Sequence, residues 1–139
     1  MGKRIQRVDR EIIPSKPIFK KLALGWTGAI LFATLSPTGG ISLFEISIPH
    51  FDKVVHFGLF FVYALWVGLA IKPQSRYIYG FCIGSSLAIL TEWLQSYVPG
   101  RQADIYDGLA DVAGTIVGLF VVILLHPNSN KKQSEKPKC

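Results

Sequence analysis

Charged residues and cysteines are both scarce in this sequence, and each scarcity excludes a class of protein. Only 17% of the 139 residues are charged whereas 50% are hydrophobic, a balance that is unusual for a soluble domain. The two cysteines, Cys82 and Cys139, lie in an apolar run and at the last position, so they indicate neither a disulfide framework nor a metal site. A sequence of this length has room for a single domain. The composition therefore predicts one membrane-embedded domain.

Four apolar runs are separated by short polar or proline-containing stretches. They cover Leu22–Ser36, Val54–Ile71, Tyr77–Val98 and Gly108–Leu125. Their lengths and proline stops favour helices, since strands of a membrane barrel would show about ten alternating residues. The first run is shorter than the ~20 residues of a typical span, but the preceding Lys20 and Lys21 can snorkel and extend it. A signal peptide is the alternative for this run, although no small-residue cleavage site follows it cleanly.

The sequence therefore predicts an all-α fold, a polytopic membrane protein with a bundle of four transmembrane helices. The membrane domain spans residues 22–126, between basic tails at 1–21 and 127–139. Thirteen of the 15 lysines and arginines lie in these tails or in the connection 72–76, and the other two, Lys53 and Arg101, lie in the other connections. The positive-inside rule then places both termini in the cytoplasm of a cell-membrane protein. The basic tails suit membrane lipid headgroups rather than nucleic acid.

Polar side chains gather at the predicted outer ends of three helices. An ionisable side chain inside a bilayer costs roughly 2.5–3.5 kcal/mol on insertion scales, so such groups persist where they pair, line a cavity or perform a task. Three of the polar residues open the second helix and six lie between Thr91 and Gly114: Asp52, Lys53 and His56, then Glu92, Gln95, Arg101, Asp104, Asp107 and Asp111. Because these helix ends lie at one level, we expect one outward-facing polar site.

Several of these residues also have simple structural roles. Asp52 is a suitable N-cap for the second helix, and Asp104 and Asp107 can cap and charge the start of the fourth. Lys53 can extend to the interface, and Arg101 can neutralise nearby acids.

His56, Glu92 and Asp111 lie a turn or more inside the apolar runs, where the alternative to a site is a buried hydrogen-bond network between helices. The second and third helices are joined by a short turn, which makes them antiparallel neighbours. His56 and Glu92 each lie about 24 Å from that turn at 1.5 Å per residue, so we predict that they face each other. We also predict that the segment 41–48 packs over the outer surface, because most of its side chains are apolar.

Small residues recur at four-residue intervals on the two helices that carry the acids. They are Gly80, Gly84 and Ala88 on the third, and Gly114 and Gly118 on the fourth. This spacing predicts close helix contacts of the small-xxx-small kind.

Two stretches resemble the VanZ-like family of small bacterial membrane proteins: DKVVHFGLFFVYALW from Asp52 and EWLQSYVPGRQADIYDGLADVAGTIVG from Glu92. The family pattern is Asp-Lys-x-x-His-Phe, then Glu-x-x-Gln, Arg, Asp and a Gly-x-x-x-Gly helix. It is matched in order by Asp52, Lys53, His56, Phe57, Glu92, Gln95, Arg101, Asp107, Gly114 and Gly118. Relatives often carry Asn where this chain has Asp111, which favours a hydrogen-bonding or protonated role there over a general base. The resemblance implies action at the cell envelope, and the family's association with teicoplanin makes antibiotic resistance a hypothesis.

Two classes of function fit these residues. A binding protein would hold a lipid headgroup, wall precursor or amphiphilic antibiotic, with Lys53 and Arg101 at anionic groups and the acids at amines or hydroxyls. An enzyme would use His56 as general acid or base, oriented by Glu92 or Asp52, on a lipid-linked substrate.

A divalent metal is a variant of the enzyme hypothesis. Glu92, Asp107, Asp111 and His56 could hold Mg, Ca or Mn, although no ligand spacing is diagnostic. Ion transport is disfavoured, because the inner halves of the helices offer no polar path beyond Ser85 and Ser86. The sequence names no cofactor, no reaction, no ligand and no oligomeric state.

Overall fold

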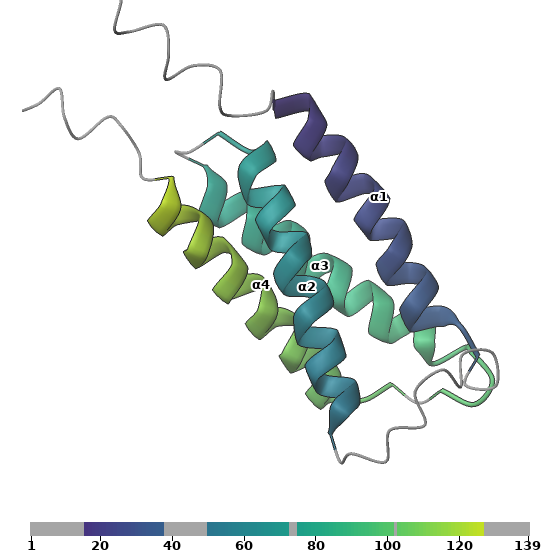
Figure 1. Ribbon diagram of the computed structural model, residues 1–139. Helices are drawn as coiled ribbons and strands as arrows, with labels where there is room; N and C mark the ends of the chain where they lie inside the picture. Colours follow the sequence, from purple (N-terminus) through teal and green to yellow (C-terminus); the bar gives the residue numbers. More distant parts are fainter. Residues whose placement is uncertain (1–15, 38–49, 73–74, 102, 127–139) are drawn as a thin grey trace, which may run out of the picture.

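The described part of the protein is a bundle of four long helices (Figure 1). The computed structural model describes residues 16–37, 50–72, 75–101 and 103–126. The helices are α1 (Lys16–Leu35), α2 (Phe51–Ala70), α3 (Arg76–Gln95) and α4 (Ile105–Leu125). Each has 20 or 21 residues and is therefore about 30 Å long, close to the thickness of the hydrocarbon core. All four are long and apolar enough to cross a membrane, which confirms the predicted fold class.

Four helix boundaries differ from the predicted ones by more than one residue. α1 begins at Lys16, six residues before the apolar run, so its first turns include residues that the sequence assigned to the basic tail 1–21. α2 and α4 begin three residues before the apolar runs, because a helix continues through polar residues as long as its backbone hydrogen bonds do. α3 ends at Gln95 and not at Val98, since Val98 precedes Pro99 and a residue before proline avoids the helical region. The predicted N-cap role of Asp52 is wrong. The cap is His50, with φ at 67°, and Asp52 lies in the first turn.

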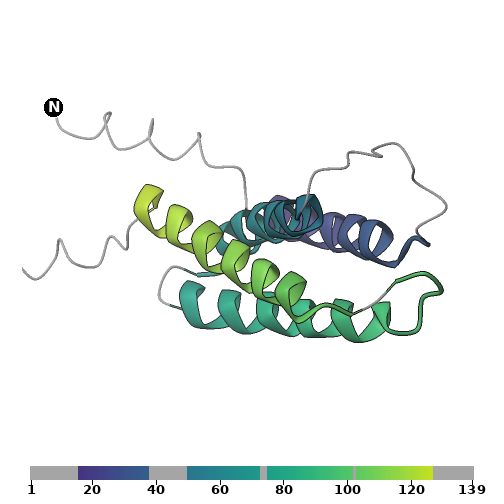
Figure 2. The same cartoon turned by 90° about the horizontal axis from the view of Figure 1, so that it is seen from below.

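α4 lies between α2 and α3, and its closest approach is to α2. Figures 1 and 2 show α4 lying against α2, with α3 on the opposite side of α4. A Cβ atom at Gly114 would meet the backbone of Phe57 and Phe61, and one at Gly118 would meet Phe61 O at 2.5 Å. These two glycines therefore allow the backbones of α2 and α4 to touch.

A second pair of glycines brings α3 against α4. A Cβ atom at Gly80 would lie 2.6 Å from Leu119 Cδ2, and one at Gly84 would lie 2.5 Å from Thr115 Cγ2. The predicted close contacts at both glycine pairs are confirmed. α2 and α3 do contact each other as predicted, but each contacts α4 more extensively.

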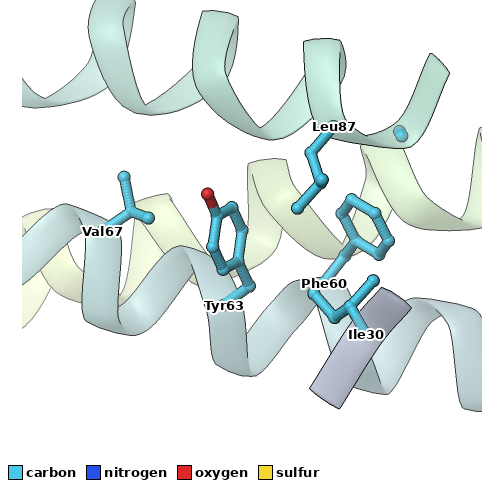
Figure 3. Close-up of a cluster of buried hydrophobic side chains, with 6 residues drawn as sticks. Ile30, Phe60, Tyr63, Val67 and Leu87 are labelled. Atoms are coloured by element: carbon cyan, nitrogen blue, oxygen red, sulfur yellow. The ribbon is translucent and has the colours of Figure 1, made fainter. Parts of the chain in front are cut away.

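The apolar core lies where α1, α2 and α3 meet. Figure 3 shows Phe60 and Tyr63 of α2 beside Leu87 of α3 and Ile30 of α1. Trp26 on α1 donates a hydrogen bond from Nε1 to Leu59 O at 2.9 Å, which ties α1 to α2. The outward faces of all four helices are rich in exposed large apolar side chains, as expected of helices that contact lipid.

Leu35, Phe51, Gln95 and Ile105 lie at one end of the bundle, which we call the site end. The segment 41–48, predicted to cover this end, lies outside the described residues.

Candidate functional site

Lys53 joins α2 to α4 at the site end. Its Nζ lies 2.8 Å from Asp104 Oδ2 and 2.9 Å from Asp107 Oδ1, with Asp52 Oδ2 further away at 3.4 Å. Lys53 belongs to the first turn of α2, and Asp107 belongs to the first turn of α4, so the start of each helix is brought against the other. One ammonium thus contacts three carboxylates at the end of the bundle.

Asp104 has two functions at the start of α4. Its Oδ1 accepts a hydrogen bond from the backbone N–H of Tyr106 at 3.0 Å, so the predicted capping role is confirmed. Its Oδ2 accepts from Lys53. The Lys53 hydrogen bond, followed by that from Tyr106, lowers the pKa of this carboxyl below its ordinary value. Asp104 therefore remains an anion that fixes both the helix start and the lysine.

His56 and Asp111 form a buried pair one turn deeper. The ring Nδ1 lies 3.0 Å from Asp111 Oδ1, and the two residues are 5% and 0% exposed. The proposed orienting partners of His56 were Glu92 and Asp52, but the hydrogen bond goes to Asp111. The reason is the contact at Gly114, which brings α4 against α2 directly beside His56. A carboxylate at this position fixes the orientation of the imidazole ring.

Glu92 comes from the last turn of α3 and meets this pair from the other side. Its Oε2 accepts a hydrogen bond from the backbone N–H of Asp104 at 3.0 Å. One ligand atom from each of His56, Glu92 and Asp111 lies within 4.8 Å of the other two, which agrees with the expected approach of His56 and Glu92. Among the described residues, Glu92 Oε1 and Asp111 Oδ2 are buried and have no hydrogen-bond partner. Two buried oxygens without a partner are energetically costly.

An apolar groove leads to Glu92 between α3 and α4. Its volume is about 480 Å³, and it is lined by Ala88, Ile89, Glu92, Ala103, Ile105, Gly108, Leu109 and Val112. Ile89, Ile105 and Leu109 are exposed, so the groove opens on the outer surface of the bundle. The sequence analysis missed this groove. Apart from Glu92, its residues are ordinary small or apolar ones from two stretches, 88–92 and 103–112, and no sequence pattern marks them.

Gln95 and Arg101 lie at the site end but contact α1. Gln95 Nε2 donates to Thr34 O at 3.1 Å, and Arg101 donates from Nε to Ser36 O and from Nη2 to Ala33 O, both at 3.3 Å. The carbonyls at the end of a helix lack partners within the helix, and these side chains supply them. Within the described part of the chain, the ion pairs of the acids involve Lys53 and His56, and not Arg101. The expectation that Arg101 neutralises the acids is therefore not met.

The helices and the polar cluster define a helical multi-pass membrane protein with a buried acid–histidine group near one end of its bundle. A family model described as VanZ/LLP1 matches residues 4–126, and the chain belongs to this VanZ-like family. No curated protein and no solved structure matches the chain.

Proposed function

We propose that this protein binds an amphiphilic molecule of the cell envelope. Its apolar chain would lie in the groove between α3 and α4, and its polar group would lie at Glu92. The groove carries this proposal, because its volume of about 480 Å³ falls within the roughly 300–1,000 Å³ of small-molecule sites. An apolar lining with one ionisable group at the end suits a molecule that is apolar along its length and polar at its tip.

The charges at the site end favour a polar group that donates hydrogen bonds. Five carboxylic residues gather there, and the nearby cations are already engaged: Lys53 by three acids and Arg101 by carbonyls of α1. A phosphate would meet the carboxylate of Glu92, which forms no ion pair with a cation of the described residues, and two like charges in contact are unfavourable. An amine or a hydroxyl can instead donate to Glu92. Direct anion binding by Lys53 and Arg101 would require both side chains to leave their present partners.

The lysine and arginine distribution supports a site at the outer leaflet. With the site end outward, the groove opens to lipid near the cell exterior. Envelope lipids, wall precursors and amphiphilic glycopeptide antibiotics all combine an apolar chain with amine or hydroxyl groups, and those members fit whose amine or hydroxyl, and not a phosphate, reaches Glu92. Membership of the VanZ-like family agrees with a function at the envelope.

A membrane-embedded enzyme is the second candidate, and the His56–Asp111 pair favours it. A histidine held by a carboxylate, with Glu92 close by, can accept and return a proton on a substrate whose polar group reaches Glu92. Turnover that is lost in His56→Gln while substrate binding remains would establish this function. Binding without turnover of any envelope lipid would leave the protein a binder.

The binding proposal can be tested with matched single-chain amphiphiles. Dodecylamine, dodecanol and dodecyl phosphate differ only in the polar group, and their binding to the purified protein in detergent can be compared by native mass spectrometry in the presence of a chelator. We expect the amine and the alcohol to bind and the phosphate to bind at least tenfold more weakly. Teicoplanin in the same assay tests whether an antibiotic enters the site.

Two variants of similar exposure provide the control. Leu109 lines the groove and Leu124 lies near the other end of the same helix, and they are 59% and 63% exposed. Leu109→Trp should block the groove and reduce binding several-fold, whereas Leu124→Trp should not. Equal effects of the two substitutions, or the tightest binding for the phosphate, would refute the proposal.

A further inference from the structure

We propose that His56, Glu92 and Asp111 form a binding site for one divalent cation, with Mn²⁺ or Zn²⁺ as the best-suited metals. The three residues come from three different helices and meet at one point, with a ligand atom of each within 4.8 Å of the others. This site goes beyond the proposed binding of an amphiphile and does not depend on it.

The oxygens without partners are the observation that points to a cation. Asp111 is fully buried, and its Oδ2 has no hydrogen-bond partner among the described residues; Glu92 Oε1 is in the same condition. The second oxygen of each carboxylate is already used, by His56 for Asp111 and by the Asp104 backbone for Glu92. Each carboxylate is therefore fixed by one oxygen and presents the other. A cation between them satisfies both at once.

The charges of the surroundings also favour a cation. Lys53, the lysine at the site end, is occupied by Asp104 and Asp107, and none of the ion pairs among the described residues joins it to Glu92 or Asp111. Two carboxylates and one imidazole that can be neutral leave a net negative charge within the apolar bundle. Buried charge of one sign is stable only when it is paired, protonated or bound to a metal.

The geometry fits metal coordination after small side-chain adjustments. Two adjacent ligands of an octahedral cation at ~2.1 Å are ~3.0 Å apart, and opposite ligands are ~4.2 Å apart. One ligand atom of each of the three residues lies within 4.8 Å of the other two, which is slightly more than the second separation, so small side-chain rotations would bring all three to one cation. One nitrogen and two carboxylate oxygens form a mixed ligand set that suits Mn²⁺ or Zn²⁺ better than the all-oxygen set of Ca²⁺.

A bound cation would make Glu92, the polar end of the groove, more selective for a hydroxyl over an ammonium. Three protein ligands leave coordination positions open, and Glu92 is at the same time the polar end of the groove. A hydroxyl suits this arrangement, because its oxygen coordinates the cation while its hydrogen is donated to a carboxylate. An ammonium would compete with the cation for the same oxygens. Bound metal should therefore weaken dodecylamine binding relative to dodecanol.

The test measures metal binding by the full chain in nanodiscs, after chelation and without any amphiphile. Titration with Mn²⁺, followed by loss of the free-ion EPR signal, should show one ion per chain. Glu92→Gln and Asp111→Asn keep the side-chain shapes and should each weaken binding by roughly tenfold or more. Asp52→Asn is the matched control, because this acid belongs to the same end of the bundle but lies outside the triad, and its affinity should stay within twofold.

A measurement on the unaltered protein guards against variants that do not fold. With ¹⁵N-labelled histidine, the electron spin echo of bound Mn²⁺ should show coupling to one histidine nitrogen, and the coupling should be absent in His56→Gln. The absence of a stoichiometric ion, no histidine coupling, or an equal loss of affinity in Asp52→Asn would overturn the metal site. Because no amphiphile is present, these outcomes are independent of the outcome of the dodecanol experiment.

Discussion

Replacing Gly114 with alanine tests the contact on which the whole site depends. The added Cβ would meet the carbonyl oxygen of Phe57, and it would lie 3.0 Å from Phe61 N and 3.1 Å from Phe57 C. All three atoms belong to the backbone of α2, so no side chain can rotate out of the way. The two helices must therefore separate at this position, and Asp111, one turn before Gly114 on α4, must move away from His56.

The expected cost follows from two opposing contributions. Overpacking a tight contact typically costs about 1–3 kcal/mol, and the absence of a movable side chain places this site in the upper half of that range. Alanine favours the helix over glycine by roughly 0.5–1 kcal/mol, which offsets part of the cost. We therefore expect the free energy of unfolding of Gly114→Ala to fall by about 1–2 kcal/mol.

The measurement is reversible unfolding in mixed micelles with increasing SDS, followed by circular dichroism. Gly58→Ala is the matched control, because Gly58 is also inside a helix of this interface and a Cβ there would have nothing within 4 Å. Gly58→Ala should be neutral or stabilise by up to about 1 kcal/mol. If the two variants unfold at the same SDS concentration, then α2 and α4 do not make the close contact described above.

Two further predictions concern the orientation and the start of α4. Reporter fusions after Gly40 and after Cys139 should read opposite sides of the membrane, because the lysine and arginine distribution places 37–53 outside and 127–139 inside; the same side for both would refute the topology. At neutral pH, Asp104→Asn should be less stable than the wild type, because it loses the charge beside Lys53 although it keeps an oxygen that can accept from Tyr106 N–H. Asp104→Ala loses both interactions and should be less stable still. The pKa of Asp104 is lowered in the fold, so its charge stabilises the fold fully above the ordinary value of 3.8, and this contribution is lost as the pH falls from there through the lower pKa of the folded state. The charge-dependent part of the stability difference between wild type and Asp104→Asn should accordingly be constant from pH 7 to about pH 5 and shrink as the pH falls below 3.8, and an SDS unfolding series from pH 7 to about pH 2 would show whether it does.

The sequence alone determined the number of helices and the place of the polar cluster. Transfer of a segment into a bilayer depends on its composition and length, which are local properties, so four apolar runs were enough to predict four spans. The same holds for the cap at Asp104, which acts within its own helix turn. The grouping of His56, Glu92 and Asp111 could be expected because all three lie at helix ends on one level.

Only the tertiary structure decided which side chains are partners. A helix can rotate about its axis without any change in its own hydrogen bonds, so the sequence does not say which face meets which neighbour. The contact at Gly114 fixes this rotation for α4, so that Asp111 forms a hydrogen bond with His56. Gln95 and Arg101 instead form hydrogen bonds with carbonyls at the end of α1 and not with the acids. The groove beside Glu92 likewise exists only where residues 88–92 of α3 come together with residues 103–112, which no residue in either helix could specify by itself.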